Sequence, residues 1–404
     1  MVTSVEIHSF KVVGKFVAGV SMENREKIMT LLFVLLGASF LFVGCNAGEH
    51  DKMHEADLPT SEPVAPIDFD AIFVVNGGDS SISVVNAASN EVVSTVKLKH
   101  VSYPHHLYLS MDGTRAVLAV PGMDLSKGHG SDGGDMPHMP GHGITGRSDK
   151  FLQANSGMHS MNAAIMVLDT STGATVVARQ LDEANHNGIF APDGKEIWTS
   201  QMTASGSVLV LDASTLATKE QITVGGMPAE ITFSRDGLYA FVANSSSDSV
   251  SVINVATKDV AMTVNVGESP VGAWQGNDDL MYVDNEAGKS LSAIDAKTHA
   301  IVRTYELGFV PGMAATSPLG DSLWVSDVNG GKLVIFKAGS TEKTGEIVTG
   351  AGAHAITFSN DGKMAYATNQ EAGTLSVIDV AAKAVINTVT VGSKPNGIAF
   401  NPKK

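Results

Sequence analysis

A repeat of about 42 residues constrains the fold of this chain more than any other feature of its sequence. Each unit holds four short runs of β-branched and aliphatic residues, separated by Gly, Asn, Asp and Ser, which is typical of short strands joined by tight turns. In one unit these runs lie at residues 228–233, 241–244, 250–254 and 260–266. A period of this length indicates an array, a solenoid or a propeller.

The turn that closes the first strand of each unit allows the units to be counted. It falls at Gly113, Gly194, Gly237, Asp278, Gly320 and Gly362, and the chain ends one period later at Lys404. The spacings are 81, 43, 41, 42, 42 and 42 residues, so only the first is anomalous, and it holds one unit plus an insertion.

The two ends of the repeat region complement each other. Residues 71–98 supply three strands without a first strand, and residues 396–401 supply a first strand alone. We therefore predict an all-β, seven-bladed β-propeller with four-stranded blades over residues 71–404, closed by pairing of the N- and C-terminal strands in one blade. The constant period disfavours a β-sandwich.

The units FVVN (73–76), FVAN (241–244) and AYATN (365–369) resemble the YVTN family of propeller repeats. The pairs Val391-Gly392…Pro395 and Val266-Gly267…Pro270 resemble that family as well. The resemblance implies a propeller over residues 71–404. It does not imply one function, because such propellers include lactonases, dehydrogenase subunits, copper enzymes and binding scaffolds.

The single cysteine, Cys45, follows an uncharged apolar run at residues 29–44, which Arg25 and Lys27 precede. The run is shorter than the roughly 20 residues of a membrane-spanning helix and is typical of a signal peptide. Its ending, LFVGC (41–45), resembles the lipobox of bacterial lipoproteins, which implies acylation of Cys45. An ordinary signal peptide with a chance cysteine is the alternative.

The N-terminal region is thus expected to have three parts before the propeller. Residues 1–21 are a leader or a misassigned start, residues 22–44 are a lipoprotein signal peptide, and residues 45–70 are a polar, unstructured tether. We expect a lipid-anchored protein of the periplasm or cell surface. Asn46 favours the outer membrane, because it is not the aspartate associated with inner-membrane retention in some bacteria.

Composition limits the partners and cofactors. The net charge of -15 disfavours nucleic acid, because an acidic surface repels phosphates. One cysteine cannot form a Cys-x-x-Cys-His haem attachment, and no glycine-rich run joins a strand to a helix as a nucleotide site requires. We expect a monomer without haem or nucleotide, attached to the membrane by its lipid, with an envelope protein as a candidate partner.

Histidines gather where the inner strands begin. About eight residues before each closing turn lie His105, His186, Ala229, Val271, Gly312, His354 and Asn396. The next position holds His106, Asn187, Glu230, Gly272, Met313, Ala355 and Gly397. Since the innermost strand lines the channel, we expect His105, His106, His186, His354 and Glu230 to ring one mouth as metal ligands or catalytic groups. Hydrogen-bonded turn residues are the alternative.

The insertion, residues 121–163, is rich in potential metal ligands. It carries four histidines and five methionines, of which His129, His138, His142, His159, Met136 and Met139 are candidate ligands. Imidazole and thioether together suit copper, and His-rich tracts are typical of metal binding. A solvated polar loop is the alternative. As a connection between the second and third strands of its blade, the insertion is expected to overhang the histidine mouth.

The adjacent His105-His106 pair, with further channel histidines, is similar to the propeller of nitrous oxide reductase. This similarity implies copper ligation by His105, His106, His186 and His354, although the cupredoxin domain of that enzyme has no counterpart here. A calcium-assisted lactonase would instead need channel carboxylates, and Glu230 with Asp248, Asp284 or Asp327 are the candidates.

Two functions therefore stay open. The first is binding of a transition metal, copper or zinc, for metal handling or redox chemistry. The second is a metal-free scaffold that recognises a protein or a glycan.

Overall fold

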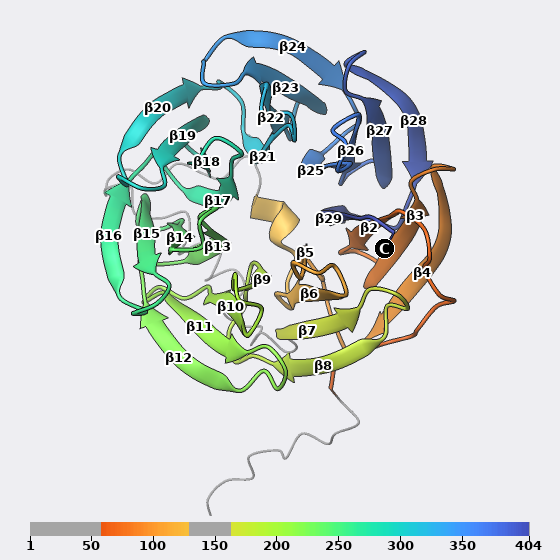
Figure 1. Ribbon diagram of the computed structural model, residues 1–404, viewed down its shortest axis with the longest axis horizontal. Helices are drawn as coiled ribbons and strands as arrows, with labels where there is room; N and C mark the ends of the chain where they lie inside the picture. The colour runs from red at the N-terminus through yellow and green to blue at the C-terminus, as the bar shows by residue number, and fades with distance from the viewer. Residues whose placement is uncertain (1–57, 129–162, 404) are drawn as a thin grey trace, which may run out of the picture. The chain divides into compact units, whose positions relative to one another are not determined.

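A computed structural model describes residues 58–128 and 163–403. The chain divides into two compact units, Met1–His54 and Glu55–Lys404, and every described residue belongs to the second. Seven antiparallel sheets form a β-propeller in that unit (Figure 1). Within the described residues, no helix has the length and apolar character needed to cross a membrane.

The second to seventh blades each have four strands in sequence order from the channel outward, and the innermost strands of the blades form the inner ring of Figure 1. The second blade consists of β5 (Leu107–Leu109), β6 (Arg115–Val120), β7 (Ala164–Asp169) and β8 (Thr175–Gln180), and the third of β9 (Gly188–Phe190), β10 (Glu196–Gln201), β11 (Ser207–Asp212) and β12 (Thr218–Thr223). The fourth blade consists of β13 (Pro228–Phe233), β14 (Tyr239–Asn244), β15 (Ser249–Asn254) and β16 (Val260–Asn265), and the fifth of β17 (Pro270–Gln275), β18 (Leu280–Asn285), β19 (Ser290–Asp295) and β20 (Ile301–Glu306). The sixth blade consists of β21 (Pro311–Thr316), β22 (Ser322–Asp327), β23 (Lys332–Lys337) and β24 (Lys343–Val348), and the seventh of β25 (Ala353–Phe358), β26 (Met364–Asn369), β27 (Thr374–Asp379) and β28 (Ala384–Thr390).

The first blade joins the two ends of the repeat region. β29 (Pro395–Asn401) is its innermost strand and pairs antiparallel with β2 (Ala71–Asn76), which β3 (Ser81–Asn86) and β4 (Glu91–Lys99) follow. The predicted seven blades and the shared closing blade are therefore confirmed. Each sheet has two edge strands, the innermost at the channel and the outermost at the rim of the ring.

The expectation of an unstructured tether over residues 45–70 is wrong for its last part. β1 (Thr60–Ser61) pairs with the outer edge of β4, and the backbone N–H of Val64 donates to Thr172 O at 2.9 Å. Val64, Ile67 and Phe69 pack against the core between the first two blades. These three apolar side chains cover that core, which the polar composition around them concealed.

Two recurring residues of the repeat are explained by one contact. At the end of β18, buried Asn285 donates from Nδ2 to Ser290 and Ser292 on β19, at 3.0 Å each. A Cβ on Gly267, in the preceding turn, would lie 2.7 Å from Asn285 Cγ. Asn76, Asn244 and Asn369 make the same pair of hydrogen bonds in their blades, each beside a glycine. The asparagine thus joins two strands, and the glycine leaves room for it.

The hydrophobic core lies between blades. One cluster combines Trp198, Val208 and Val210 of the third blade with Ile231 and Val242 of the fourth. The middle strands are almost wholly buried, whereas outer strands such as β16 are exposed. Packing of sheet faces against each other therefore fixes the ring and leaves its inner strands free to carry polar side chains into the channel.

Five inner strands, among them the β13 strand that bears Glu230, begin with an irregularity. The register of β13 on β14 shifts between Pro228 and Ile231, and β17, β21, β25 and β29 show equivalent shifts. A β-bulge places two residues opposite one on the partner strand and re-aims their side chains. Ala229 and Glu230 lie in this bulge of β13.

Candidate functional site

Three of the predicted ring histidines come together. His105, His106 and His186 offer nitrogen atoms that all lie within 4.8 Å of one another, and each residue is at most 4% exposed. His105 and His106 immediately precede β5, where the N–H of His105 donates to Ala119 O at 2.9 Å and the N–H of Ala119 donates to His106 O at 3.0 Å. His186 precedes β9 of the next blade. We call these residues the three-histidine cluster.

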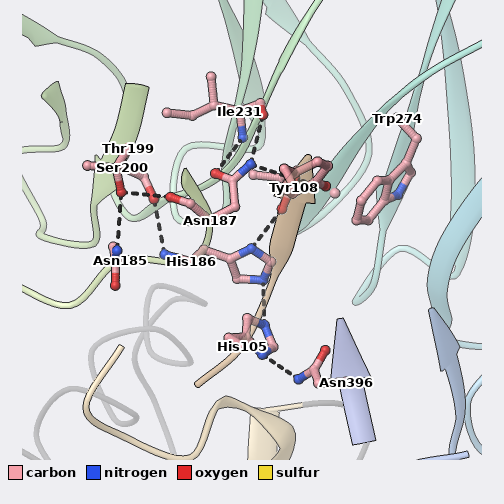
Figure 2. A network of polar contacts seen from close by, with 12 residues as sticks. His105, Tyr108, Asn185, His186, Asn187, Thr199, Ser200, Ile231, Trp274 and Asn396 are labelled. Atoms are coloured by element: carbon pink, nitrogen blue, oxygen red, sulfur yellow. Dashed lines mark hydrogen bonds and ion pairs between the residues drawn. The ribbon is translucent and has the colours of Figure 1, made fainter. Parts of the chain in front are cut away.

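Hydroxyl groups on β10 hold the chain on both sides of His186 (Figure 2). The N–H of His186 donates to Ser200 Oγ at 3.2 Å, and Thr199 Oγ1 donates to Asn187 O at 2.7 Å. Asn185 donates in turn to Thr199 Oγ1 at 3.2 Å. Since these groups are buried, the hydrogen bonds satisfy the backbone and fix the direction of the imidazole.

A chain of polar contacts runs through the cluster (Figure 2). Asn396 of β29 contacts His105 Nδ1, and His105 Nε2 faces His186 Nε2 at 3.3 Å. His186 Nδ1 lies 3.0 Å from Glu230 Oε2. An ionised carboxylate only accepts hydrogen bonds, so when Glu230 is ionised Nδ1 of His186 carries the proton and Nε2, which faces His105, carries the lone pair.

Glu230 is the buried end of this chain of contacts. Its side chain is fully buried, and Oε1 accepts hydrogen bonds from the Tyr108 hydroxyl and from Asn187 Nδ2. Burial raises the pKa of Glu230 to about 7, and the charge of His106 with the hydrogen bonds from Tyr108 and Asn187 offsets only part of that rise. Burial, followed by the charge of Glu230, also raises the pKa of Tyr108.

His354 lies beside the three-histidine cluster and is not one of its members. Its ring centroid is 6.4 Å from that of His105 and 6.2 Å from that of His106, whereas those two rings are 4.4 Å apart. His354 is more distant because it lies on β25, and β29 of the first blade, which bears Asn396, lies between β25 and β5. A Cβ on Gly312 would come within 3.2 Å of the His354 ring, so this glycine leaves space for it.

Three residues near the cluster escaped the sequence reasoning as functional candidates: Tyr108, Asn187 and Trp274. Asn187 occupies the same position of its repeat unit as His106 and Glu230. Tyr108 lies two residues after His106, and Trp274 lies two residues after Gly272, so the alternation of side chains along a strand places each on the same face as that residue. The Trp274 ring centroid is 6.0 Å from that of His106, and its Nε1 donates to Asp284.

The carboxylates considered for a calcium site do not gather around Glu230. Fully buried Asp284 accepts from Trp274 Nε1 and from the N–H of Gly272. Asp248 and Asp327 accept backbone hydrogen bonds from Ser269 and Gly330. Within the described ranges, the one group of possible metal ligands is the three-histidine cluster.

The insertion starts over the same mouth. Its first turn is the 3-10 helix η2 (Leu125–Gly128), drawn in gold at the centre of the ring in Figure 1. Asp124 forms an ion pair with Lys394, two residues before Asn396. The candidate ligands His129, Met136, His138, Met139, His142 and His159, and the lipidation candidate Cys45, lie outside the described residues.

Comparison with known proteins shows the fold alone. No protein-family model matches the chain, and no curated protein does. Among solved structures, a periplasmic gluconolactonase of Pseudomonas aeruginosa is 18% identical, with a TM-score of 0.63, 83% of this chain covered and 99% of that chain.

Other neighbours have different names. A putative 6-phosphogluconolactonase of Bacteroides fragilis is 17% identical (TM-score 0.61, 82% of this chain and 98% of that chain), and hydrazine synthase of Kuenenia stuttgartiensis is 16% identical (TM-score 0.60, 84% and 99%). Similarity at this level establishes a shared propeller and leaves function to the site itself.

Proposed function

We propose that this chain binds a transition metal, copper or zinc, through His105, His106 and His186. One observation carries the proposal: two imidazole Nε2 atoms face each other at 3.3 Å while both Nδ1 atoms are held from behind by Asn396 and Glu230. Ligating histidines bind the metal with one nitrogen, and their other N–H is donated to a carboxylate or carbonyl oxygen.

The supporting contacts fit this arrangement at both histidines. Glu230 accepts from Nδ1 of His186, which leaves Nε2 as the metal donor. Asn396 Oδ1 makes no hydrogen bond within the described residues, so a rotated amide can accept the Nδ1 proton of His105 in the same way. A metal ion would bind both Nε2 atoms, which lie 3.3 Å apart in the metal-free protein.

Copper handling or redox chemistry outside the cytoplasm is the role that we propose for this site. The signal-peptide pattern and the lipobox-like ending at Cys45 support export and lipid anchoring, and the Met/His-rich insertion supports copper. A lactonase function, which the names of two neighbours suggest, has weaker support. Glu230 and Asp284 each accept hydrogen bonds from protein groups, and within the described residues neither carboxylate belongs to a group of three possible metal ligands.

Elemental analysis tests the proposal. The purified protein is loaded separately with Cu⁺, Cu²⁺ and Zn²⁺, desalted and analysed for retained metal. We expect about one equivalent in the parent protein, a reduction of at least tenfold in affinity in His186→Ala, and no change in His100→Asn. His100 is a suitable control because it is an exposed histidine that directly follows β4 of the first blade. Retention of none of the three ions would refute metal binding and favour the metal-free scaffold.

A further inference from the structure

We infer that the three-histidine cluster is a four-coordinate metal centre with its fourth position open to a small exogenous ligand, water, hydroxide or another small anion. The inference rests on the proposed function and deepens it, because it specifies the geometry of the metal and the class of ligand it accepts. It concerns the described residues only and is argued from the distances between the side chains of His105, His106 and His186.

The distance between two donors sets the angle at the metal. With metal–nitrogen bonds of about 2.05 Å, the observed Nε2–Nε2 separation of 3.3 Å corresponds to an angle of about 107°. The tetrahedral angle is about 109°, so the spacing of these two nitrogen atoms matches that required by a tetrahedral ion. A square-planar or octahedral ion, with angles of about 90°, would need the two atoms about 2.9 Å apart.

His106 supplies the third donor from the same inner strand end. Its ring centroid is 4.4 Å from that of His105 and 5.0 Å from that of His186, close to the 4.6 Å that separates His105 from His186. The three ring centroids therefore form a nearly equilateral triangle, and one nitrogen atom of each ring lies within 4.8 Å of the other two. A three-histidine site of this kind leaves one tetrahedral position for solvent or substrate.

No fourth protein ligand completes the group within residues 58–128 and 163–403. Glu230 contacts Nδ1 of His186 rather than the Nε2 atom that faces His105. The centroid of the His354 ring lies 6.2 Å or more from those of His105 and His106. The surroundings are tight, since the rings of His106, His354 and Trp274 are at most 6% exposed. The open position therefore suits a small ligand, and it favours Zn²⁺ or Cu⁺ over square-planar Cu²⁺.

Cobalt substitution of the full chain tests the geometry and the open position together. Four-coordinate Co²⁺ gives intense visible d–d bands, whereas six-coordinate Co²⁺ gives weak ones. We expect intense bands that shift on titration with azide, unchanged in His100→Asn and lost in His105→Ala. X-ray absorption at the zinc edge provides a second measurement, and four nitrogen or oxygen neighbours at about 2.0 Å are expected.

The contrary results are distinct. Weak bands, or five to six neighbours around zinc, would overturn the tetrahedral geometry. Intense bands that azide leaves unchanged would show a fourth protein ligand and overturn the open position. Failure to retain any metal in the elemental analysis would instead reject the proposed function, and with it the reason for this inference.

Discussion

The burial of Glu230 predicts how the stability of the metal-free protein depends on pH. Its pKa rises from 4.5 to about 7 on folding, so the native state binds this proton more tightly than the unfolded state. The resulting stabilisation is fully present below pH 4.5 and is lost as pH rises through about 7. At about 1.4 kcal/mol for each unit of pKa, the loss amounts to about 3 kcal/mol.

Glu230→Gln removes this titration while it keeps the size of the side chain. Its amide oxygen still accepts from Tyr108 and Asn187, which contact Oε1 in the parent protein. As the pH rises from 4.5 to 8, we expect the free energy of unfolding of the variant to increase by about 3 kcal/mol relative to that of the parent protein. The substitution can also change stability by an amount that does not depend on pH, and the value at pH 4.5 serves as the reference that removes it. Urea unfolding in the presence of a chelator, at four or five pH values, measures this difference in the free energy of unfolding.

Glu196→Gln is the matched control because its pKa moves in the opposite direction. Burial alone would raise the pKa of Glu196, but hydrogen bonds from Lys258, Lys219 and Trp198 outweigh it and lower the pKa to about 2. The contribution of Glu196 is present above pH 4.5 and is lost as pH falls through about 2. A difference between Glu230→Gln and the parent that stays constant from pH 4.5 to pH 8 would refute the argument from burial.

Three further predictions concern packing, the metal and the anchor. Gly267→Ala places a Cβ 2.7 Å from Asn285 Cγ and should cost about 1–3 kcal/mol in unfolding free energy, whereas Gly345→Ala, with its nearest contact at 3.4 Å, should be close to neutral. Bound Co²⁺ should quench the fluorescence of Trp274, whose ring lies 6.0 Å from that of His106. The other two tryptophans, Trp198 and Trp324, instead pack against Phe233 and Phe358. A quench that persists unchanged in Trp274→Phe would therefore place the metal elsewhere. Cys45→Ser should abolish incorporation of labelled palmitate and release the protein from membranes; retention of the label would contradict acylation at this residue.

The candidate site could be predicted from sequence only in part. Alignment on the closing turn placed His105, His106, His186 and Glu230 at one mouth, because the repeat fixes each position along its strand. It could not separate His354 from the others, since that depends on the blade that lies between. The hydrogen bonds that leave Nε2 of His186 facing His105 also depend on which side chains meet across blades.

By itself the sequence determined the repeat, the number of blades and the shared closing blade. These features follow from local alternation, turn residues and the spacing of the units, which act over a few residues at a time. Tertiary structure alone decided that residues 60–69 pack on the first two blades and that three histidines, with Glu230 behind one of them, form a single cluster. The physical reason is that donor distances, burial and the raised pKa of Glu230 arise only when strands from separate blades are brought to the same point of the channel.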